Sequence, residues 1–319
     1  MSRYLKKEDV LQFLDIGDDM RQVFRQPFTK AVYQNEIVRQ FQEKILTEED
    51  LSIAIFLYTY KFATIEQLYR GVKTERTFEK FKSRVEKLVN GRVVNKFILT
   101  YAPEMDRILK DDAFTVYCLD IGGHHLLTHF WHNDSVLDWL YITNIVPSES
   151  VAQTLLVTEV GLSFLENKPE GFKYFKPAPE LRIAKKMLIP SFELCLEKDG
   201  RTVYFLGEVV RKEDVRTVFR DRSQKWNYLL KTFAWKKYYD TGTGQEPVML
   251  VITNDDESAL RTSSVLFDVA EIEKFRLSTP ERLKNPLGSP DAFLKYIPDG
   301  TPQLALTAIR NFEPAEKKQ

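Results

Sequence analysis

Residues 74–90, TERTFEKFKSRVEKLVN, constrain the fold most, because a helical projection separates them into faces of different chemistry. At about 100° per residue, four cations fall within roughly 80° of one another. They are Arg76, Lys80, Arg84 and Lys87. A second face has the apolar spacing of a helix that buries one side in a core. Its residues are Phe78, Phe81, Val85, Leu88 and Val89. Gly91 is expected to end the helix in the left-handed conformation.

A basic stripe opposite an apolar one is typical of a DNA-recognition helix, which anchors one face to its domain and turns the other to phosphates and bases. The alternative is a solvated helix with ordinary surface lysines. From Arg70 to Lys96 there are nine Lys or Arg against three Glu, in a chain of zero net charge. The positive charge is therefore local. If the four cations and Lys96 each neutralise one phosphate, log affinity for DNA falls with log salt with a slope of roughly −4 to −5.

Two helices are predicted before this one. Thr47 precedes three acidic residues and an apolar run, which predicts a capped helix over residues 48–60. Thr64 then caps a short second helix that ends at Gly71.

Two strands are predicted after it, over residues 93–101 and 114–119. The charged residues 103–112 between them form a wing-like loop, and Lys96 is expected at the wing, near phosphate. Three helices followed by a hairpin predict a winged helix-turn-helix. Some winged helices mediate only protein contacts, which is the alternative.

Composition narrows the class of protein. A chain of 319 residues with 43% hydrophobic content is large enough for two or three domains. Cys118 and Cys195 lie far apart, so neither a disulfide framework nor a cysteine zinc site is indicated, and a cytoplasmic location is predicted. No apolar run approaches the roughly 18–20 residues that span a bilayer, so no membrane association is expected.

The four histidines all lie in the sequence GGHHLLTHFWHND. His125, His129 and His132 would share one face of a helix, which raises the question of a metal site. The general-base Glu of an HExxH motif is missing, and only Asp134 and Asp138 are nearby acidic ligands. A packing cluster between domains is the preferred interpretation, and no metal is predicted.

The second half of the chain is predicted to contain an α/β unit. Residues 187–210 predict two strands joined by a turn at 198–200. A long helix over 214–239 and a buried strand over 247–253 complete an α/β unit. Helices over 134–145 and 148–166 and a linker at 168–179 precede it. Residues 276–319 are rich in Pro, Gly and charge and are expected to form a loosely ordered tail.

This order of segments resembles the replication-relaxation family of plasmids and integrative mobile elements. In that family a winged helix-turn-helix precedes a domain similar to the PD-(D/E)xK restriction-endonuclease fold. The resemblance covers about residues 47–255 and includes VYCLDIGG, the HND segment, and IPSFELCLEKDGRTVYFLGEVV with the helix that carries Lys225 and Tyr228.

The segments and this resemblance together predict an α+β fold with four parts. Residues 1–46 would be an N-terminal helical arm, packed on a later domain or on a partner chain. Residues 47–127 would be the winged helix-turn-helix. Residues 128–275 would be a helical connector and a degenerate nuclease-like α/β domain, and residues 276–319 the tail.

The nuclease motif is incomplete in this chain. A nuclease of this fold needs carboxylates from two strands to hold Mg²⁺, and a lysine two residues beyond the second acid. Ser191 stands where the Asp belongs, Glu208 matches the second acid, and Val210 takes the lysine position. Glu193 shares a strand face with Ser191 and Lys225 could reach inward. If the chain is a nuclease, its catalytic residues are thus Glu208, Glu193 and Lys225 with Mg²⁺; the preferred interpretation has no catalytic residues and no cofactor.

A second basic cluster follows the nuclease-like strands, softened by neighbouring acids. Its members are Arg211, Lys212, Arg216, Arg220, Arg222 and Lys225. It predicts either a second DNA-contacting surface or an ordinary mixed-charge helix face.

The leading hypothesis is a non-catalytic accessory factor that binds double-stranded DNA in plasmid or mobile-element replication or conjugative transfer. Its DNA contacts are expected from Arg76, Lys80, Arg84, Lys87 and Lys96. A relaxase, other replication or transfer proteins, and a second copy of the chain are the candidate protein partners. The alternatives are a metal-dependent DNA nuclease and a transcriptional regulator.

Overall fold

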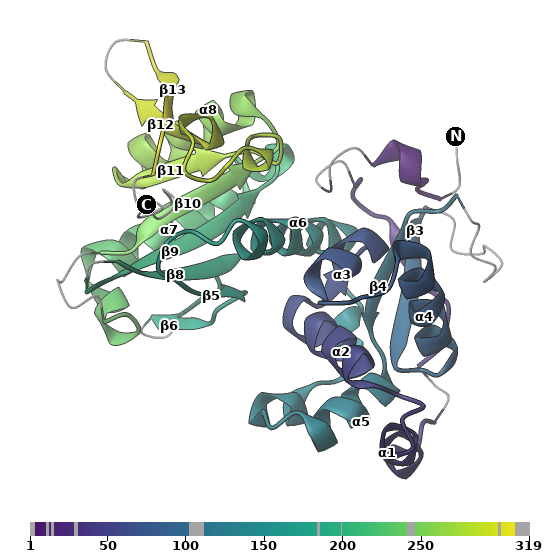
Figure 1. Cartoon of the computed structure of the whole chain (residues 1–319). Helices are drawn as coiled ribbons and strands as arrows, with labels where there is room; N and C mark the ends of the chain where they lie inside the picture. The colour runs from purple at the N-terminus through teal and green to yellow at the C-terminus, as the bar shows by residue number, and fades with distance from the viewer. Residues whose placement is uncertain are drawn as a thin grey trace, which may run out of the picture. The chain divides into compact units, whose positions relative to one another are not determined.

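The computed structural model describes residues 4–10, 13, 16–28, 31–101, 112–183, 186–198, 200–240, 246–298 and 301–309. The chain divides into unit 1, residues 1–158, and unit 2, residues 159–319. Each unit combines helices with a sheet (Figure 1), which confirms the α+β prediction.

Unit 1 contains a four-stranded antiparallel sheet in the order β1-β3-β4-β2. Its strands are β1 (Arg21–Phe24), β2 (Phe62–Ala63), β3 (Val94–Thr100) and β4 (Thr115–Leu119). The pairing of β3 with β4 is the hairpin predicted from the sequence. Strand β1 pairs with β3, so the N-terminal residues are part of this unit. The expected wing-like loop lies outside the described residues, apart from Asp112.

Five helices precede or follow these strands in unit 1. They are α1 (Gln34–Gln42), α2 (Glu48–Tyr60), α3 (Ile65–Gly71), α4 (Phe78–Asn90) and α5 (Ile121–Phe130), with a 3₁₀ turn η1 at Lys7–Asp9. Helix α2 begins after Thr47 as predicted, because the Asp50 carboxylate accepts hydrogen bonds from the Thr47 amide (2.7 Å) and hydroxyl (3.0 Å). In α3, Thr64 Oγ1 accepts from the Gln67 amide at 3.2 Å.

Helix α4 buries the predicted apolar face. Phe81, Val85, Leu88 and Val89 are each at most 2% exposed, and burial of such side chains contributes about 1.5–3 kcal/mol apiece. The helix begins four residues later than residue 74. Thr74 Oγ1 accepts from the Arg76 amide at 3.1 Å, and Tyr69 donates to the Arg76 carbonyl at 3.1 Å, which holds this stretch outside the helix.

The end of α4 differs from the prediction. Gly91 has φ −80°, and Arg92 takes the left-handed conformation with φ 62°. The Arg92 side chain turns inward from this position and pairs with Asp120, which is fully buried. Its Nε and Nη2 donate to the two carboxylate oxygens at 2.6 and 3.0 Å. Asp120 also accepts from the Ile121 amide at 2.8 Å, so one carboxylate joins the end of α4 to the start of α5.

The segment after α5 forms two 3₁₀ turns, η3 (Asp134–Asp138) and η4 (Tyr141–Asn144). The single helix predicted over residues 134–145 is therefore wrong. Side-chain capping by Asn133, which accepts from the Ser135 amide at 3.1 Å, favours the tight turn. Helix α6 (Ser148–Glu166) has the predicted bounds and contains the boundary between the two units. No helix in the described part of the chain has the length and apolar character needed to cross a bilayer.

Unit 2 is built on a seven-stranded mixed sheet in the order β13-β12-β11-β10-β9-β8-β5. Its strands are β5 (Phe172–Pro177), β8 (Phe192–Lys198), β9 (Arg201–Val210), β10 (Val248–Thr253), β11 (Phe275–Ser278), β12 (Phe293–Ile297) and β13 (Gln303–Thr307). Strands β9, β10 and β11 run parallel, and the other neighbours are antiparallel. Each strand thus lies next to the strand that precedes it in the chain. A separate pair joins β6 (Leu181–Ile183) to β7 (Lys186–Leu188).

Two predictions about the flanks of this sheet are wrong. The expected linker at 168–179 contains β5, and the expected tail at 276–319 supplies most of β11 and all of β12 and β13. Leu277, Phe293 and Leu294 are at most 2% exposed, so β11 and β12 belong to the core. Each has only four or five residues, too few to show a clear period in the sequence.

The helices of unit 2 are α7 (Val218–Lys231) and α8 (Asp256–Ser264). Shorter turns are η5 (Lys212–Asp214), η6 (Ala234–Lys237), η7 (Val265–Val269), η8 (Arg282–Lys284) and η9 (Pro290–Ala292). The long helix predicted over 214–239 is broken, because Phe233 adopts φ 55°. Phe219, Trp226 and Leu229 of α7 are buried in the core of this unit.

We expect Asp120→Ala to lower the free energy of unfolding of unit 1 by about 3–5 kcal/mol, because it removes the carboxylate that the buried Arg92 guanidinium contacts and uncaps α5. Chemical denaturation with hydrogen exchange of the α4 and α5 amides measures this. Asp134→Ala, at an exposed carboxylate, is the control. Equal stability of the two variants would contradict the structural role of the pair.

Candidate functional site

A shallow depression on the outward face of α4 brings together the four cations predicted on this helix face. Its volume is about 370 Å³. The lining residues are Arg76, Glu79, Lys80, Ser83, Arg84 and Lys87. Its cations differ in what else they contact, and this decides which of them are available to a ligand.

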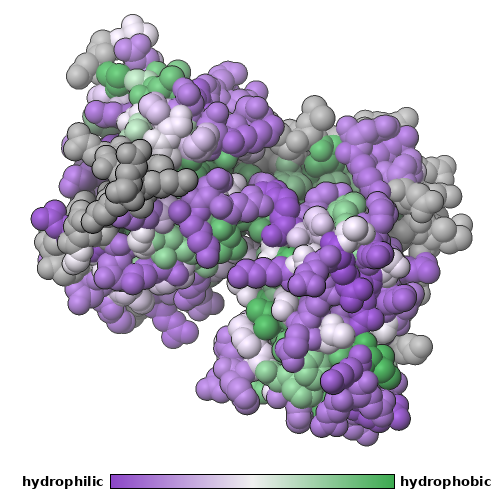
Figure 2. Space-filling view, in the orientation of Figure 1, coloured by the Kyte–Doolittle hydropathy of each residue, from purple (hydrophilic) through white to green (hydrophobic). Residues whose placement is uncertain are grey.

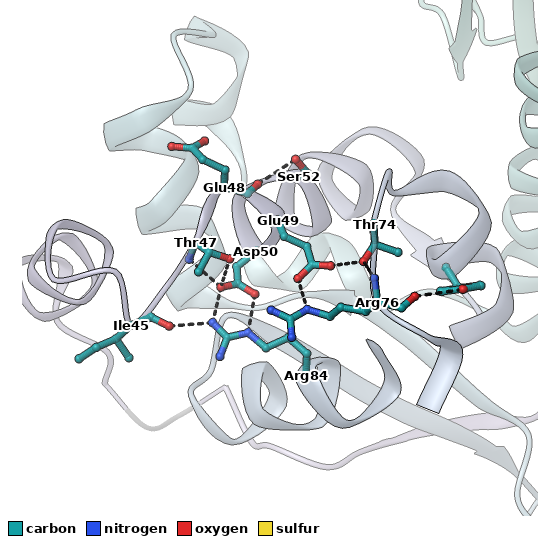
Figure 3. A network of polar contacts seen from close by, with 10 residues as sticks. Ile45, Thr47, Glu48, Glu49, Asp50, Ser52, Thr74, Arg76 and Arg84 are labelled. Carbon is teal, nitrogen blue, oxygen red and sulfur yellow. Dashed lines mark hydrogen bonds and ion pairs between the residues drawn. The ribbon is translucent and has the colours of Figure 1, made fainter. Parts of the chain in front are cut away.

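Arg84 is bound to the start of α2 (Figure 3). Its Nε donates to Asp50 Oδ1 at 2.8 Å, its Nη2 also contacts Asp50 Oδ2, and Nη2 donates to the Ile45 carbonyl at 2.7 Å. Asp50 is fully buried and the Arg84 side chain is 18% exposed. A buried carboxylate is stable only with such a partner, so this arginine joins α4 to α2.

Arg76 takes part in the same network from the residues before α4 (Figure 3). Its Nε donates to Glu49 Oε2 at 2.5 Å, and Thr74 Oγ1 contacts the other oxygen of Glu49. The Arg76 side chain is 42% exposed, whereas the Glu49 side chain is only 16% exposed. Solvent therefore reaches the pair mainly from the arginine side, and ion pairs with solvent access contribute little free energy.

Lys96 lies inside β3, away from the expected wing tip. Its Nζ donates to both oxygens of Glu86, at 2.8 and 2.7 Å, and Tyr117 donates to the same carboxylate at 3.1 Å. Burial raises the pKa of Tyr117 and the Glu86 carboxylate adds to the shift. This lysine therefore ties the hairpin to α4.

Lys80 and Lys87 are exposed, and neither forms an ion pair within the described part of the chain. They lie seven residues apart, about two turns of helix, on the same face. Within the described residues, the basic stripe is thus reduced to two lysines without an ion pair, with Arg76 paired to Glu49 beside them.

The histidines of α5 serve packing. His124 Nε2 donates to the Val136 carbonyl at 2.9 Å and its ring stacks on Trp139 with centroids 5.1 Å apart. His125 Nε2 donates to the Val32 carbonyl at 3.1 Å. Among the described residues no group of three His, Cys, Asp or Glu is placed to hold a metal ion.

Unit 2 contains the nuclease-like strands, and Ser191, the residue before β8, lies against Glu208 of β9. The Ser191 hydroxyl donates to Glu208 Oε2 at 3.4 Å and accepts from the Val209 amide at 3.0 Å. The Glu208 carboxylate is 1% exposed. Burial raises its pKa, and the Arg222 guanidinium opposes that shift.

Arg222 of α7 is the cation that faces Glu208. Its Nη2 donates to Oε1 and Oε2 at 2.8 and 2.7 Å, and to the Ile189 carbonyl at 2.7 Å. The indole Nε1 of Trp226, one turn later, donates to Oε1 at 2.7 Å. The guanidinium thus contacts both oxygens of the Glu208 carboxylate and a backbone carbonyl.

The other two nuclease candidates lie elsewhere. Glu193 is 5% exposed and accepts from Tyr174 at 2.5 Å and Tyr239 at 2.8 Å. Its carboxylate raises the pKa of both tyrosines, in addition to the larger effect of burial. Lys225 is exposed on α7 and has no described contact with Glu208.

These residues do not fit Mg²⁺. The ion requires nearly octahedral oxygen ligands at about 2.0–2.1 Å, most often carboxylates and water. Both Glu208 oxygens already accept two hydrogen bonds each, Ser191 supplies no carboxylate, and Glu193 is held by two tyrosines. No catalytic step through a metal follows from this geometry.

Sequence reasoning did not pair Arg222 with Glu208 or bring Trp226 to the carboxylate. Arg222 appeared only as one member of a basic cluster in which Arg211 is buried and paired with Asp214 at 3.4 Å. The incomplete nuclease motif is the signal that could have identified Arg222. If Glu208 is buried and the motif's lysine and second acid are missing, its carboxylate needs another cation as a partner.

Comparisons with known proteins add little to this geometry. No family model matches the chain, and no curated protein matches it. Among solved structures, it is similar to restriction endonuclease FokI, with a TM-score of 0.31, 14% identity and coverage of 73% of this chain and 42% of that one. FokI bound to DNA gives a TM-score of 0.26 and 13% identity, with coverage of 73% and 43%. This chain spans less than half the length of FokI. Because both TM-scores are low, the functional site is interpreted from the contacts between residues of this chain.

We expect Arg84→Met to lower the free energy of unfolding of unit 1 by about 3–5 kcal/mol, because it leaves the buried Asp50 carboxylate unpaired. Lys87→Met on the same face changes it by less than about 0.5 kcal/mol. Urea denaturation with hydrogen exchange of the α2 amides measures both. Unchanged stability of Arg84→Met would make this arginine a surface contact residue.

Arg222→Met tests the pair in unit 2 through pH. Without the guanidinium the pKa of the buried Glu208 rises further, so the ionised carboxylate costs stability. We expect little loss below about pH 4, where glutamate is protonated in both states, and a growing loss toward pH 7. The loss at neutral pH should reach about 3 kcal/mol.

The double variant Arg222→Met/Glu208→Gln is the control for that pH dependence. It removes the titrating group, so urea midpoints measured from pH 4 to pH 8 should lose the difference in slope from wild type. A double variant that keeps the pH-dependent loss would assign it to another group.

Proposed function

We propose that this chain is a non-catalytic protein that binds double-stranded DNA through α4 of unit 1. The observation that carries this proposal is the depression on α4, where Lys80 and Lys87 are exposed and unpaired within the described chain. The opposite face of the same helix is buried, so the helix that carries these cations is fixed to the core of the unit. A rigid basic helix face suits contact with phosphates and base edges.

The order of elements supports the placement of α4. Helix α2, strand β2, helices α3 and α4, and the β3–β4 hairpin follow one another as in a winged helix-turn-helix, in which the third helix enters the major groove. In this interpretation α2 and α3 hold the recognition helix through the network around Asp50 and Glu49.

We propose fewer contacts with DNA phosphates than the sequence alone predicted. Arg84 holds a buried carboxylate and Lys96 holds Glu86, so neither is assigned a phosphate. Lys80, Lys87 and Arg76 remain, and the partly exposed Arg76 reaches DNA by exchanging its Glu49 partner for a phosphate. Three phosphate contacts give a slope of log affinity against log salt of about −2 to −3.

We propose that the chain does not cleave DNA, because of the contacts that the Glu208 carboxylate makes. A nuclease needs carboxylate oxygens free to bind Mg²⁺, whereas Arg222, Trp226 and Ser191 use those of Glu208. A nuclease-like unit with this internal ion pair is better suited to a supporting role than to phosphodiester cleavage.

The resemblance to the replication-relaxation family suggests the biological setting. It favours an accessory factor in plasmid or mobile-element replication or conjugative transfer, with relaxase partners and a homodimer as further predictions. A transcriptional regulator would use the same helix. Footprints at an origin rather than at promoters would favour the accessory role.

We expect Lys80→Ala/Lys87→Ala to weaken binding to duplex DNA by at least tenfold at physiological salt and to reduce the salt slope by about 2. Both positions are exposed, so folding should be unaffected. Fluorescence anisotropy with labelled duplex over a salt series measures affinity and slope together.

Lys82→Ala is the matched control, because Lys82 is exposed on the same helix but lies about 160° around the axis from Lys80. It should bind as wild type does. Supercoiled DNA in the same samples with Mg²⁺ or Mn²⁺ should stay intact. Salt-independent binding, or cleavage that Glu208→Ala abolishes, would overturn the proposal.

A further inference from the structure

The segment over residues 134–145 exposes an unusual amount of apolar surface. Five large hydrophobic side chains within nine residues are each at least 44% exposed. They are Leu137, Leu140, Tyr141, Ile142 and Ile145. Figure 2 shows hydrophobic surface on the part of unit 1 where Figure 1 places α5, the helix that leads into this segment.

The segment is fixed to the body of unit 1. Val136 and Asn144 are at most 1% exposed, and Asn144 Nδ2 donates to the Leu119 carbonyl at 2.9 Å. His124 bonds the Val136 carbonyl, and Gln22 of β1 donates to the Asn144 carbonyl at 3.0 Å and accepts from the Val146 amide at 3.0 Å. These contacts fix the segment, so the apolar side chains have one arrangement. Binding of a partner would therefore cost little conformational entropy in this segment.

A depression of about 270 Å³ lies beside these side chains. Tyr58, Ser135, Asp138 and Trp139 are among the residues that line it, with Lys61 from the end of α2. The Lys61 ammonium lies 5.4 Å from the centroid of the buried Phe62 ring. Ser135, Asp138 and Trp139 of this lining belong to the segment itself. The depression is thus a concave site next to the exposed apolar side chains, which can hold an anchoring side chain of a protein partner.

The charges of residues in and next to the segment indicate which class of partner could bind there. Asp134 and Asp138 are exposed and form no ion pair within the described residues. The sequence from residue 111 to residue 167 contains no Lys or Arg. Like charges disfavour DNA and anionic membranes on this surface, and a two-fold dimer through it would bring the aspartates of two copies together.

We propose that residues 134–145 form a docking surface for a basic amphipathic segment of another protein. The apolar side chains would cover the hydrophobic face of that segment, and Asp134 and Asp138 would pair with Lys or Arg at its edge. This mode needs no feature of α4, so it is independent of the proposed DNA binding. It gives the chain a second surface through which a bound partner could be brought to DNA.

The full chain can be tested with a fluorescent synthetic amphipathic peptide of leucine and lysine, and with a matched peptide in which glutamate replaces lysine. We expect wild type to bind the lysine peptide at least tenfold more tightly than the glutamate peptide. Leu137→Ser/Ile142→Ser should weaken binding of the lysine peptide at least tenfold. Asp134→Asn/Asp138→Asn should weaken it severalfold and flatten its salt dependence.

Ile45→Ser is the control, because Ile45 is 56% exposed elsewhere in unit 1 and close to Ile142 in exposure. Its affinity for the lysine peptide should equal that of wild type. Equal binding of the two peptides, or unchanged binding by Leu137→Ser/Ile142→Ser, would overturn the proposal. Self-association or binding to anionic vesicles that this double variant abolishes would assign the surface to a second copy or to a membrane instead.

Discussion

The pairing of a buried carboxylate with an arginine recurs at three positions on which this structure depends. Asp50, Asp120 and Glu208 are each at most 1% exposed, and their partners are Arg84, Arg92 and Arg222. Each pair joins elements that are separate in sequence: α4 to α2, α4 to α5, and α7 to β9. An unpaired buried carboxylate would cost several kcal/mol, so the arginines are required wherever these acids are buried.

This use of arginine explains how a chain with 46 basic and 46 acidic residues can carry a local positive surface. Counting charges along residues 70–96 overstates that surface, because Arg84, Arg92 and Lys96 are held by Asp50, Asp120 and Glu86. Lysine, with its flexible stem and strongly hydrated head, supplies the free cations at positions 80 and 87. In the proposed function, Arg84, Arg92 and Lys96 stabilise unit 1, whereas Lys80 and Lys87, with Arg76, contact the DNA.

The sequence predicted the elements that carry local signals. The cap at Thr47, the start and end of α6 and the β8–β9 hairpin were all readable from neighbouring residues, and the α+β class followed from them. Arg222 could not be assigned to Glu208, because only the fold brings α7 over β9. Strands β11 to β13 were missed for a related reason: a strand of four or five residues is defined by its sheet neighbours more than by its own pattern. Gly91 and Arg92 exchanged roles because a buried ion pair outweighs the cost of a left-handed arginine.

The strand order of unit 2 has a consequence for how the unit is made. Apart from the separate β6–β7 pair, each strand from β8 to β13 is added beside the previous strand of the same sheet, so the sheet can extend from one edge as the chain leaves the ribosome. Only the parallel steps from β9 to β10 and from β10 to β11 require longer crossovers, whose closure is slower than that of hairpins. A nascent chain that stops before β10 would leave the edge of β9, the strand that carries Glu208, without its neighbour. The free backbone groups of that edge could then form hydrogen bonds with other nascent chains.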